Sequence, residues 1–182
     1  MRPLLKWAGG KRNLVERILG MFPPGHEERA YHEPFVGGGA VFFKLEPEAG
    51  SINDVNGRLM GFYRVVRDRP EELIEAAEGY VYEEEAYYRF RDRFNQRPGD
   101  PVEDAALLLY LNKTGYNGLY RVNSKGEFNV PFGRYSDPRI VHPRQIRRAS
   151  RLLDGVEVFS GDFEYIKGCA RDGDVCYLDP PY

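Results

Sequence analysis

The sequence predicts an α/β fold, in which a sheet built from the two ends of the chain is interrupted by an inserted lobe of helices and one β-hairpin. Two observations support this prediction. Short apolar runs alternate with segments of helical periodicity before residue 57 and again after residue 153. Between them helical periodicity dominates. We therefore expect one domain formed by residues 1–56 and 154–182, with residues 57–153 as the insertion.

The first segment contains two helices and two strands. Leu14, Ile18 and Met21 recur at helical spacing, and the prolines and glycine at 23–25 end that helix. The elements that follow are a strand, a short helix and a second strand, over residues 31–36, 40–45 and 51–55.

The inserted lobe begins with helices. An apolar stripe of one helix is formed by Leu59, Phe62, Tyr63 and Val66. A second helix over 101–112 follows Asp100, with Glu103 three residues later as in a capping box. The turn signal at 117–118 introduces a hairpin, whose arms are residues 119–123 and 127–130. The last elements are a helix, a strand, a short helix and a strand, over residues 144–153, 156–159, 163–170 and 175–178.

Composition excludes several classes of protein. A chain of 182 residues is long enough for one core with a small inserted lobe. No apolar stretch approaches the roughly 20 residues of a membrane span, and charge and glycine follow the amino terminus too soon for a signal peptide. We therefore expect a cytoplasmic protein without a membrane partner. Cys169 and Cys176 lack partners at metal-ligand spacing, so no metal site is expected.

Charge is unevenly distributed, although the net charge is only −2. Residues 112–151 contain nine Lys and Arg against two acids, whereas residues 70–104 contain four Arg against eleven acids. One interpretation is that the basic stretch binds a polyanion while the acidic stretch faces away. The other is that both are solvated helix faces, which is the more common situation for charge runs.

A glycine-rich loop and an acid indicate a nucleotide-like ligand. Gly37, Gly38 and Gly39 follow the strand at 31–36, where they would allow a ligand to approach the backbone closely. Asp54 stands at the end of the next strand, where a carboxylate can accept hydrogen bonds from both ribose hydroxyls. The glycine run lacks dinucleotide-fingerprint spacing, so a tight structural turn is an equal alternative for the loop alone.

The run Asp179-Pro180-Pro181-Tyr182 follows an apolar strand, and ligands of open α/β sheets bind at the carboxyl edge of such strands. The Asp179 carboxylate and the Pro180 carbonyl are two neighbouring acceptors, which suit one exocyclic amino group. Tyr182 can stack on a flat ring, so the group is suited to an extruded nucleobase. An ordinary Pro-Pro turn after a strand is the alternative.

Five ordered motifs over the whole chain resemble those of the Dam-type DNA adenine amino-methyltransferases, which have a Rossmann-like methyltransferase sheet. They are Lys6-Trp7-Ala8-Gly9-Gly10-Lys11, Glu33-Pro34-Phe35-Val36-Gly37-Gly38-Gly39, Asn53-Asp54-Val55-Asn56, the long run 111–123 with 126–133, and Asp179-Pro180-Pro181-Tyr182. The resemblance implies S-adenosylmethionine as methyl donor, which the family binds at positions corresponding to Trp7, Lys11, Phe35, Gly37, Gly39, Asp54, Asp162 and Asp179. Asp179, Pro180 and Tyr182 would be the catalytic residues.

The resemblance also implies double-stranded DNA as substrate, with base flipping and methylation of adenine within GATC. Arg121 is the candidate for a bidentate contact to guanine, because its planar fork matches two major-groove acceptors. By resemblance, Tyr116 and Asn117 would wedge into the duplex, and Leu119 and Pro131 would touch neighbouring bases. The expected phosphate contacts are Lys113, Arg134 and Arg139. Burial of Tyr116 and Leu119 in the lobe core is the alternative for those two residues.

The sequence departs from the family pattern at its end, because related enzymes continue beyond the terminal tyrosine and add strands to the sheet. We expect a monomer with four strands, the last of them an uncovered edge. An active adenine methyltransferase is the first hypothesis, and its biological setting, restriction-modification or another, is left open. A donor- or DNA-binding remnant without turnover is the second, and a cytosine or RNA methyltransferase is the third.

Overall fold

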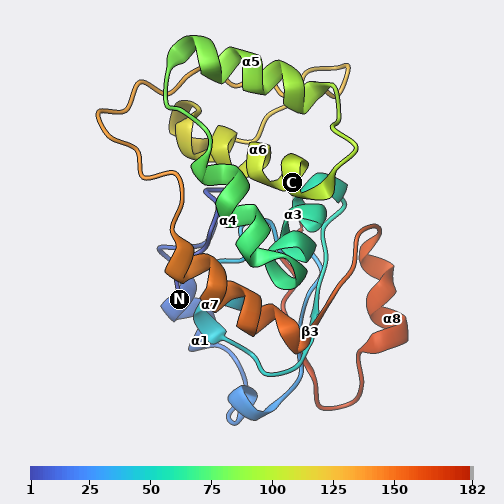
Figure 1. Cartoon of the computed structure of the whole chain (residues 1–182). Helices are drawn as coiled ribbons and strands as arrows, with labels where there is room; N and C mark the ends of the chain where they lie inside the picture. Colours follow the sequence, from blue (N-terminus) through green and yellow to red (C-terminus); the bar gives the residue numbers. More distant parts are fainter. Residues whose placement is uncertain (181–182) are drawn as a thin grey trace.

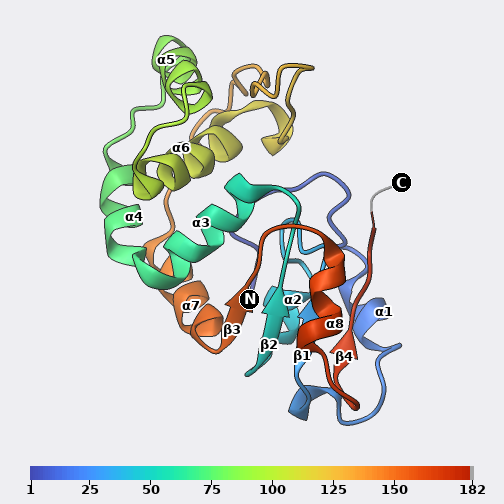
Figure 2. The ribbon, with the colours of Figure 1, turned by 90° about the vertical axis from the view of Figure 1, so that its right-hand side faces the viewer.

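The computed structural model describes residues 1–180 and contains the expected parallel sheet. Its strands are β1 (Tyr31–Glu33), β2 (Gly50–Ile52), β3 (Val156–Val158) and β4 (Val175–Cys176), in the order β3-β2-β1-β4. All three pairings are parallel, so the predicted α/β fold class is confirmed (Figure 2). β4 lies at one end of this order, as expected. Tyr182 lies outside the described residues.

The strands are shorter than the apolar runs suggested. The first was expected over 31–36 but ends at Glu33. The next residue, Pro34, has no backbone N–H to donate, so the ladder cannot continue through it. The apolar residues beyond each strand end lie in loops at the carboxyl edge instead.

Eight α-helices and three short 3-10 segments are present in residues 1–180. The helices are α1 (Val15–Leu19), α2 (Phe42–Leu45), α3 (Gly57–Asp68), α4 (Pro70–Glu78), α5 (Glu84–Asn95), α6 (Pro101–Thr114), α7 (Pro143–Asp154) and α8 (Ile166–Cys169), and the 3-10 segments are η1 (His26–Glu28), η2 (Tyr116–Gly118) and η3 (Phe163–Tyr165). The α6 cap at Asp100 is confirmed, because its carboxylate accepts from the backbone N–H groups of Val102 and Glu103 at 3.2 and 3.3 Å. The Glu103 carboxylate pairs with Arg93 instead of completing a capping box.

The first helix is confirmed, but of its three spaced apolar residues only Ile18 lies within it and is buried. Leu14 and Met21 are 48% and 72% exposed, and neither lies within α1. The buried pair is Val15 and Ile18, three residues apart. The helix makes barely more than one turn, so a stripe extrapolated over two turns fails at both ends.

Side chains that alternate along β1 separate the two faces of the sheet. Glu33 points toward α2, where the backbone N–H of Phe42 donates to its carboxyl group at 3.1 Å. His32 points to the other face, where its Nδ1 lies 2.7 Å from Ser51 Oγ. Ser51 Oγ in turn lies 2.8 Å from the Tyr165 hydroxyl of η3. The α2 and η3–α8 segments therefore cover opposite faces.

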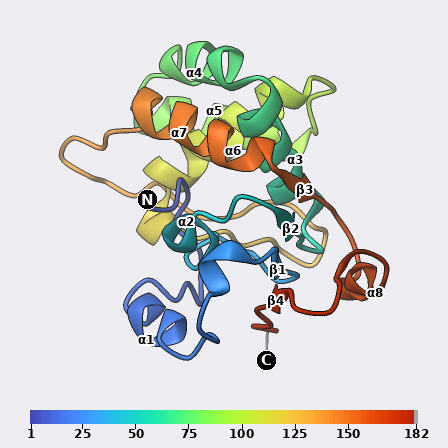
Figure 3. The same ribbon diagram turned by 90° about the horizontal axis from the view of Figure 1, so that it is seen from below.

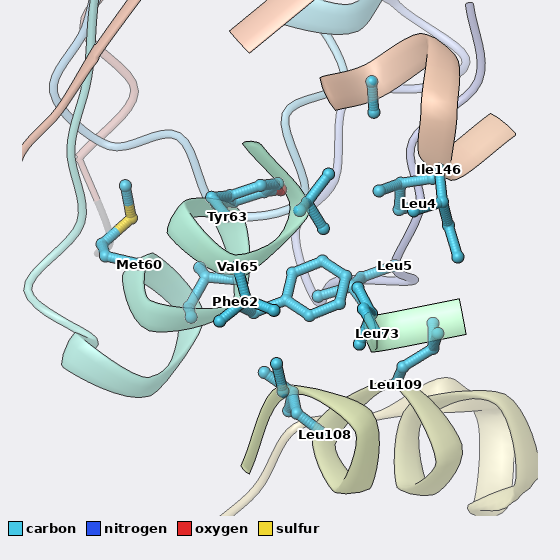
Figure 4. Close-up of a cluster of buried hydrophobic side chains, with 14 of the residues drawn as sticks. Leu4, Leu5, Met60, Phe62, Tyr63, Val65, Leu73, Leu108, Leu109 and Ile146 are labelled. Atoms are coloured by element: carbon cyan, nitrogen blue, oxygen red, sulfur yellow. The ribbon is translucent and has the colours of Figure 1, made fainter. Parts of the chain in front are cut away.

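One hydrophobic core runs through the sheet domain and the inserted lobe. α7 packs against α3, α4 and β3, and α3 packs against α6 (Figures 1 and 3). Figure 4 shows Leu4 and Leu5 of the amino terminus beside side chains of α3, α4, α6 and α7. The expected division at residues 56 and 154 thus crosses a continuous packed region, and it stays a prediction.

The segment after α6 pairs with itself as expected but forms no extended ladder. Val122 and Phe128 form an isolated antiparallel bridge, and the Asn129 N–H donates to the Arg121 carbonyl at 3.1 Å. A second bridge joins Gly115 to Phe132. We call residues 119–130 the recognition ribbon, after the role that the sequence resemblance implies for them.

Replacing Phe62 by Ala should lower the free energy of unfolding by about 3–5 kcal/mol, because its fully buried ring lies at the centre of this core. Urea denaturation monitored by circular dichroism measures the change. The exposed Met21→Ala variant is the control and should stay within about 0.5 kcal/mol of the parent. A comparable loss in both variants would contradict the assignment of Phe62 to the core.

Candidate active site

Loops that leave the carboxyl ends of the strands enclose a cavity of about 440 Å³. Its lining comes from the amino-terminal segment and from the loops after β1, β2, β3 and β4. The parallel strand directions bring these four loops to one edge, where open α/β sheets bind ligands. A volume of several hundred Å³ is in the range of small-molecule sites.

Most of the residues that the sequence assigned to a donor site line this cavity. They are Trp7, Lys11, Phe35, Gly37, Asp54, Asp162 and Asp179, and Pro180, which was assigned a catalytic role, lines the cavity as well. Gly39 does not line it. At Gly39 φ is +68°, and a Cβ there would come within 2.9 Å of the Phe43 ring. Its observed surroundings are thus those of a tight turn before α2.

The Asp54 carboxylate is oriented by backbone donors. One oxygen accepts from the N–H of Gly37 at 3.1 Å, and the other accepts from the N–H of Asn56 at 2.9 Å. Each carboxylate oxygen has two lone-pair positions, so both oxygens retain acceptor capacity toward the cavity. The glycine loop and the acid, which were separate sequence signals, are therefore directly hydrogen-bonded.

An ion pair joins the amino-terminal segment to the end of the chain. Lys11 Nζ lies 2.5 Å from Asp179 Oδ2 and 3.1 Å from the Gly9 carbonyl oxygen. Both side chains are about three-quarters buried. The ammonium group holds one carboxylate oxygen of Asp179, and within residues 1–180 the other oxygen accepts no hydrogen bond.

Glu33 is a buried acid in the cavity wall that the sequence analysis did not single out. Its carboxyl group accepts from the Tyr31 hydroxyl at 2.8 Å, in addition to the Phe42 N–H. Burial, with a smaller contribution from the nearby Asp179 charge, raises the pKa of Glu33 to about 8 against the effect of those two hydrogen bonds. Glu33 is therefore largely neutral at pH 7, which limits the negative charge beside Asp179.

Other missed residues act on the shape of the cavity. The Asn53 side-chain amide donates to the carbonyls of Pro34 and Gly161, both at 3.0 Å, and so ties the loop after β1 to the loop after β3. Phe163 also lines the cavity, with its ring centroid 5.5 Å from that of Phe35. Asn53 directly follows a strand, so its position at the edge of the sheet could have been predicted. No sequence pattern pointed to Phe163.

The residues expected to contact DNA lie mostly on the surface around η2 and the recognition ribbon. Tyr116 is 53% exposed, so the alternative that it belongs to the core is wrong. Asn117 has φ of +54° and is exposed. Leu119 is partly buried and packs against the core, and Pro131 is exposed, with its carbonyl 2.9 Å from the Tyr116 N–H.

The expected basic contacts have different surroundings. Arg121 is exposed, and its guanidinium donates to the side-chain and backbone oxygens of Asn129 at 2.7 and 3.1 Å. Burial, with Lys6 and Arg12 nearby, lowers the pKa of Lys113 to about 8. Arg134 lies 3.4 Å from Glu84, and Arg139 is exposed.

The acidic and basic stretches do not face opposite directions throughout. Arg147 of the basic stretch forms a two-point ion pair with Glu71 of the acidic stretch, at 2.7 Å. Arg134 and Glu84 also pair between the stretches. The expected separation of the charges is thus incomplete, because α4 and α7 pack side by side.

Among residues 1–180, no helix is long and apolar enough to cross a membrane. Within the same described part of the chain, His, Cys, Asp and Glu side chains form no group of three or more that could hold a metal ion.

Replacing Glu33 by Gln should flatten the dependence of stability on pH. The unfolded chain releases the Glu33 proton near pH 4.5, whereas the folded chain retains it to about pH 8, so the wild type loses stability between these values, by at most about 1.4 kcal/mol per pH unit. The amide oxygen of the substituted side chain can still accept from Tyr31 and Phe42. Urea denaturation from pH 5 to pH 8 should show that the free energy of unfolding of the Glu33→Gln variant increases relative to that of the wild type as pH rises. Parallel profiles would show that Glu33 titrates normally.

Comparison with known proteins matches nearly the whole chain to one family. The profile of the D12 class N6 adenine-specific DNA methyltransferases covers residues 7–182. Among similar proteins, the type II methyltransferase M1.LlaDCHI of Lactococcus lactis subsp. cremoris is 43% identical over 189 residues, and the type II methyltransferase M.MjaIII of Methanocaldococcus jannaschii is 42% identical over 200 residues. The DNA adenine methylase of Escherichia coli K12 is 40% identical over 187 residues.

These alignments include all of this chain and 66%, 69% and 65% of the three relatives, respectively, so the chain spans about two thirds of their length. The family profile and the cavity agree on the same segments, because the profile begins at Trp7 and includes every other residue of the cavity lining. The chain belongs to the D12 class N6 adenine-specific DNA methyltransferase family.

Proposed function

We propose that this protein transfers a methyl group from S-adenosylmethionine to the exocyclic amino group of adenine in duplex DNA, within the sequence GATC. The observation that carries the proposal is the Asp179 carboxylate, held by Lys11 at the wall of a cavity that also contains Asp54. Family membership supports adenine in DNA as the target class. The resemblance to the Dam-type enzymes supports GATC.

The cavity has groups that fit each part of the donor. The Asp54 carboxylate retains acceptor capacity for the ribose hydroxyls, and the aromatic rings of Phe35 and Phe163 offer apolar surface to the adenine. Trp7 and Lys11 would lie at the methionine end. Asp162, which caps η3 through the Glu164 N–H at 2.8 Å, would lie beside the adenine ring. When bound there, the donor supplies an electrophilic methyl group.

Asp179 and Pro180 would hold the target nitrogen. An adenine amino nitrogen is a weak nucleophile, because its lone pair is delocalised into the ring. Acceptance of its two N–H hydrogens by the Asp179 carboxylate and the Pro180 carbonyl would favour a pyramidal nitrogen with its lone pair available. Holding both reactants in this geometry can contribute about 7 kcal/mol or more to lowering the barrier. Tyr182 is the proposed stacking partner of the extruded base.

The exposed residues of η2 and the recognition ribbon would bind the duplex. Tyr116 and Asn117 form the exposed turn that we propose enters the base stack, with Leu119 and Pro131 beside it. Arg121 would exchange its hydrogen bonds with Asn129 for acceptors of guanine. Lys113, Arg134 and Arg139 would contact phosphates.

The Asp179→Asn variant should lose methyl transfer by at least about 100-fold, because an amide is a weaker acceptor and presents an N–H group to the target nitrogen. Radiolabelled methyl transfer to a GATC duplex measures this. The exposed Asp172→Asn variant is the matched control and should retain activity. If the wild type bound the donor but transferred no methyl group, the alternative of a binding remnant without turnover would be favoured instead.

The Arg121→Ala variant should lose discrimination at one guanine of the site, by about 1–3 kcal/mol. Methylation of duplexes that carry each base at that position measures the discrimination. The Lys113→Ala variant is the comparison, because loss of a phosphate contact should weaken binding to all duplexes equally and reduce its salt dependence. If Arg121→Ala lowered activity on all four duplexes in proportion, Arg121 would be a phosphate contact or a structural residue.

A further inference from the structure

Residues 4–11, which we call the N-terminal strap, contact the core, the donor cavity and the recognition ribbon within eight residues. Leu4 and Leu5 are 3% and 4% exposed and anchor the strap in the hydrophobic core (Figure 4). Trp7 and Lys11 line the cavity. Because Leu4 and Leu5 are buried, they fix the positions from which residues 6–11 extend toward the cavity and the ribbon.

Asn112 fixes the strap to the turn that carries Tyr116 and Asn117. Its side chain is buried, and its oxygen accepts from the Lys6 N–H at 2.9 Å while its amide donates to the Lys6 carbonyl at 2.8 Å. The same amide donates to the Gly118 carbonyl at 2.9 Å. Gly118 has φ of +63°, and a Cβ there would collide with the Lys6 side chain. The strap and η2 therefore form one tightly packed unit.

The Trp7 ring contacts the donor loop and the recognition ribbon at once. A Cβ at Gly37 would lie 2.8 Å from Trp7 Cδ1, so the indole lies directly against the glycine loop. The ring also stacks on Tyr120, with centroids 5.1 Å apart and an interplanar angle of 23°. Tyr120 contacts Phe128 edge-on at 5.8 Å, and thus touches the other arm of the ribbon.

We propose that Tyr120 is a positioning residue that couples donor binding to DNA binding through its stack on Trp7. This inference rests on the proposed function of the cavity and the ribbon. A donor that contacts Trp7 restricts its ring, which restricts Tyr120 and the neighbouring Arg121 before DNA arrives. The first ligand to bind then bears part of the conformational entropy lost when the ribbon is restricted. Each ligand therefore increases the affinity of the protein for the other.

The test measures this coupling without turnover. Calorimetry gives the affinity of S-adenosylhomocysteine, the product of the donor, with and without a saturating GATC duplex, and the ratio of the two affinities is the coupling factor. We expect about fivefold or more for the wild type. The Tyr120→Leu variant should lower the factor at least about twofold, toward one, because the aromatic pair is lost, whereas Tyr120→Phe should retain it. Tyr120→Met gives the same comparison if the Leu variant is unstable.

Trp7 is the only tryptophan, so its fluorescence reports on the stack directly. Iodide quenching should increase in Tyr120→Leu and stay unchanged in Tyr120→Phe. The exposed Met21→Ala variant lies outside the strap, the cavity and the ribbon, and should keep the wild-type coupling factor.

Two results would overturn the inference: a wild-type coupling factor of one, or an unchanged factor in Tyr120→Leu with increased quenching of Trp7. Either result leaves the proposed function standing, provided that S-adenosylhomocysteine and the duplex each bind. Failure of the proposed function is a different observation, namely that the wild type binds neither ligand, and it removes the inference as well.

Discussion

The parallel pairing of β1 with both β2 and β4 is the constraint on which the rest of the site depends. His32 is the register partner of Ser51 on one side and of Cys176 on the other, so the loops after three strands begin at one level of the sheet. Because Pro34 ends β1 after three residues, the glycine loop starts close to the sheet. The Asn53 amide then links this loop to the one after β3. The cavity is thus a consequence of strand direction and of two hydrogen bonds.

Four acids line the cavity at this edge; Asp162 caps η3, and the other three are each accommodated by a different physical means. Glu33 is buried and largely protonated, Asp54 accepts two backbone hydrogen bonds, and Asp179 pairs with Lys11. Three unpartnered carboxylates in so small a volume would repel one another. Neutralising Glu33 and pairing Asp179 limits the repulsion, and Asp54 and Asp179 keep lone pairs that can accept further hydrogen bonds. Under the proposed function these are the acceptors that the donor ribose and the target amino group require.

The sequence predicted features that follow from local pattern, and missed those that depend on distant partners. The strand positions, the α6 cap at Asp100 and the edge that carries Asp54 and Asp179 all follow from short-range signals. The pairing of Lys11 with Asp179 joins residues at opposite ends of the chain, and the stack of Trp7 on Tyr120 joins the strap to the inserted lobe. The raised pKa of Glu33 could not be predicted from the sequence, because it depends on burial that no local pattern reveals. The first helix was predicted but most of its apolar face was not, because one turn contains too few residues to define a face.

The basic side chains that we propose contact DNA either make weak contacts within the protein or are destabilised in their charged form. Arg121 and Arg134 are exposed, with Asn129 and Glu84 as partners, and exchanging exposed hydrogen bonds or ion pairs for others costs little. Lys113 differs, because burial beside Lys6 and Arg12 lowers its pKa to about 8. A phosphate placed there would offset the repulsion among the three cations and favour the charged lysine. Under the proposed function, a phosphate contact would therefore stabilise the charged form of Lys113 more than that of either arginine.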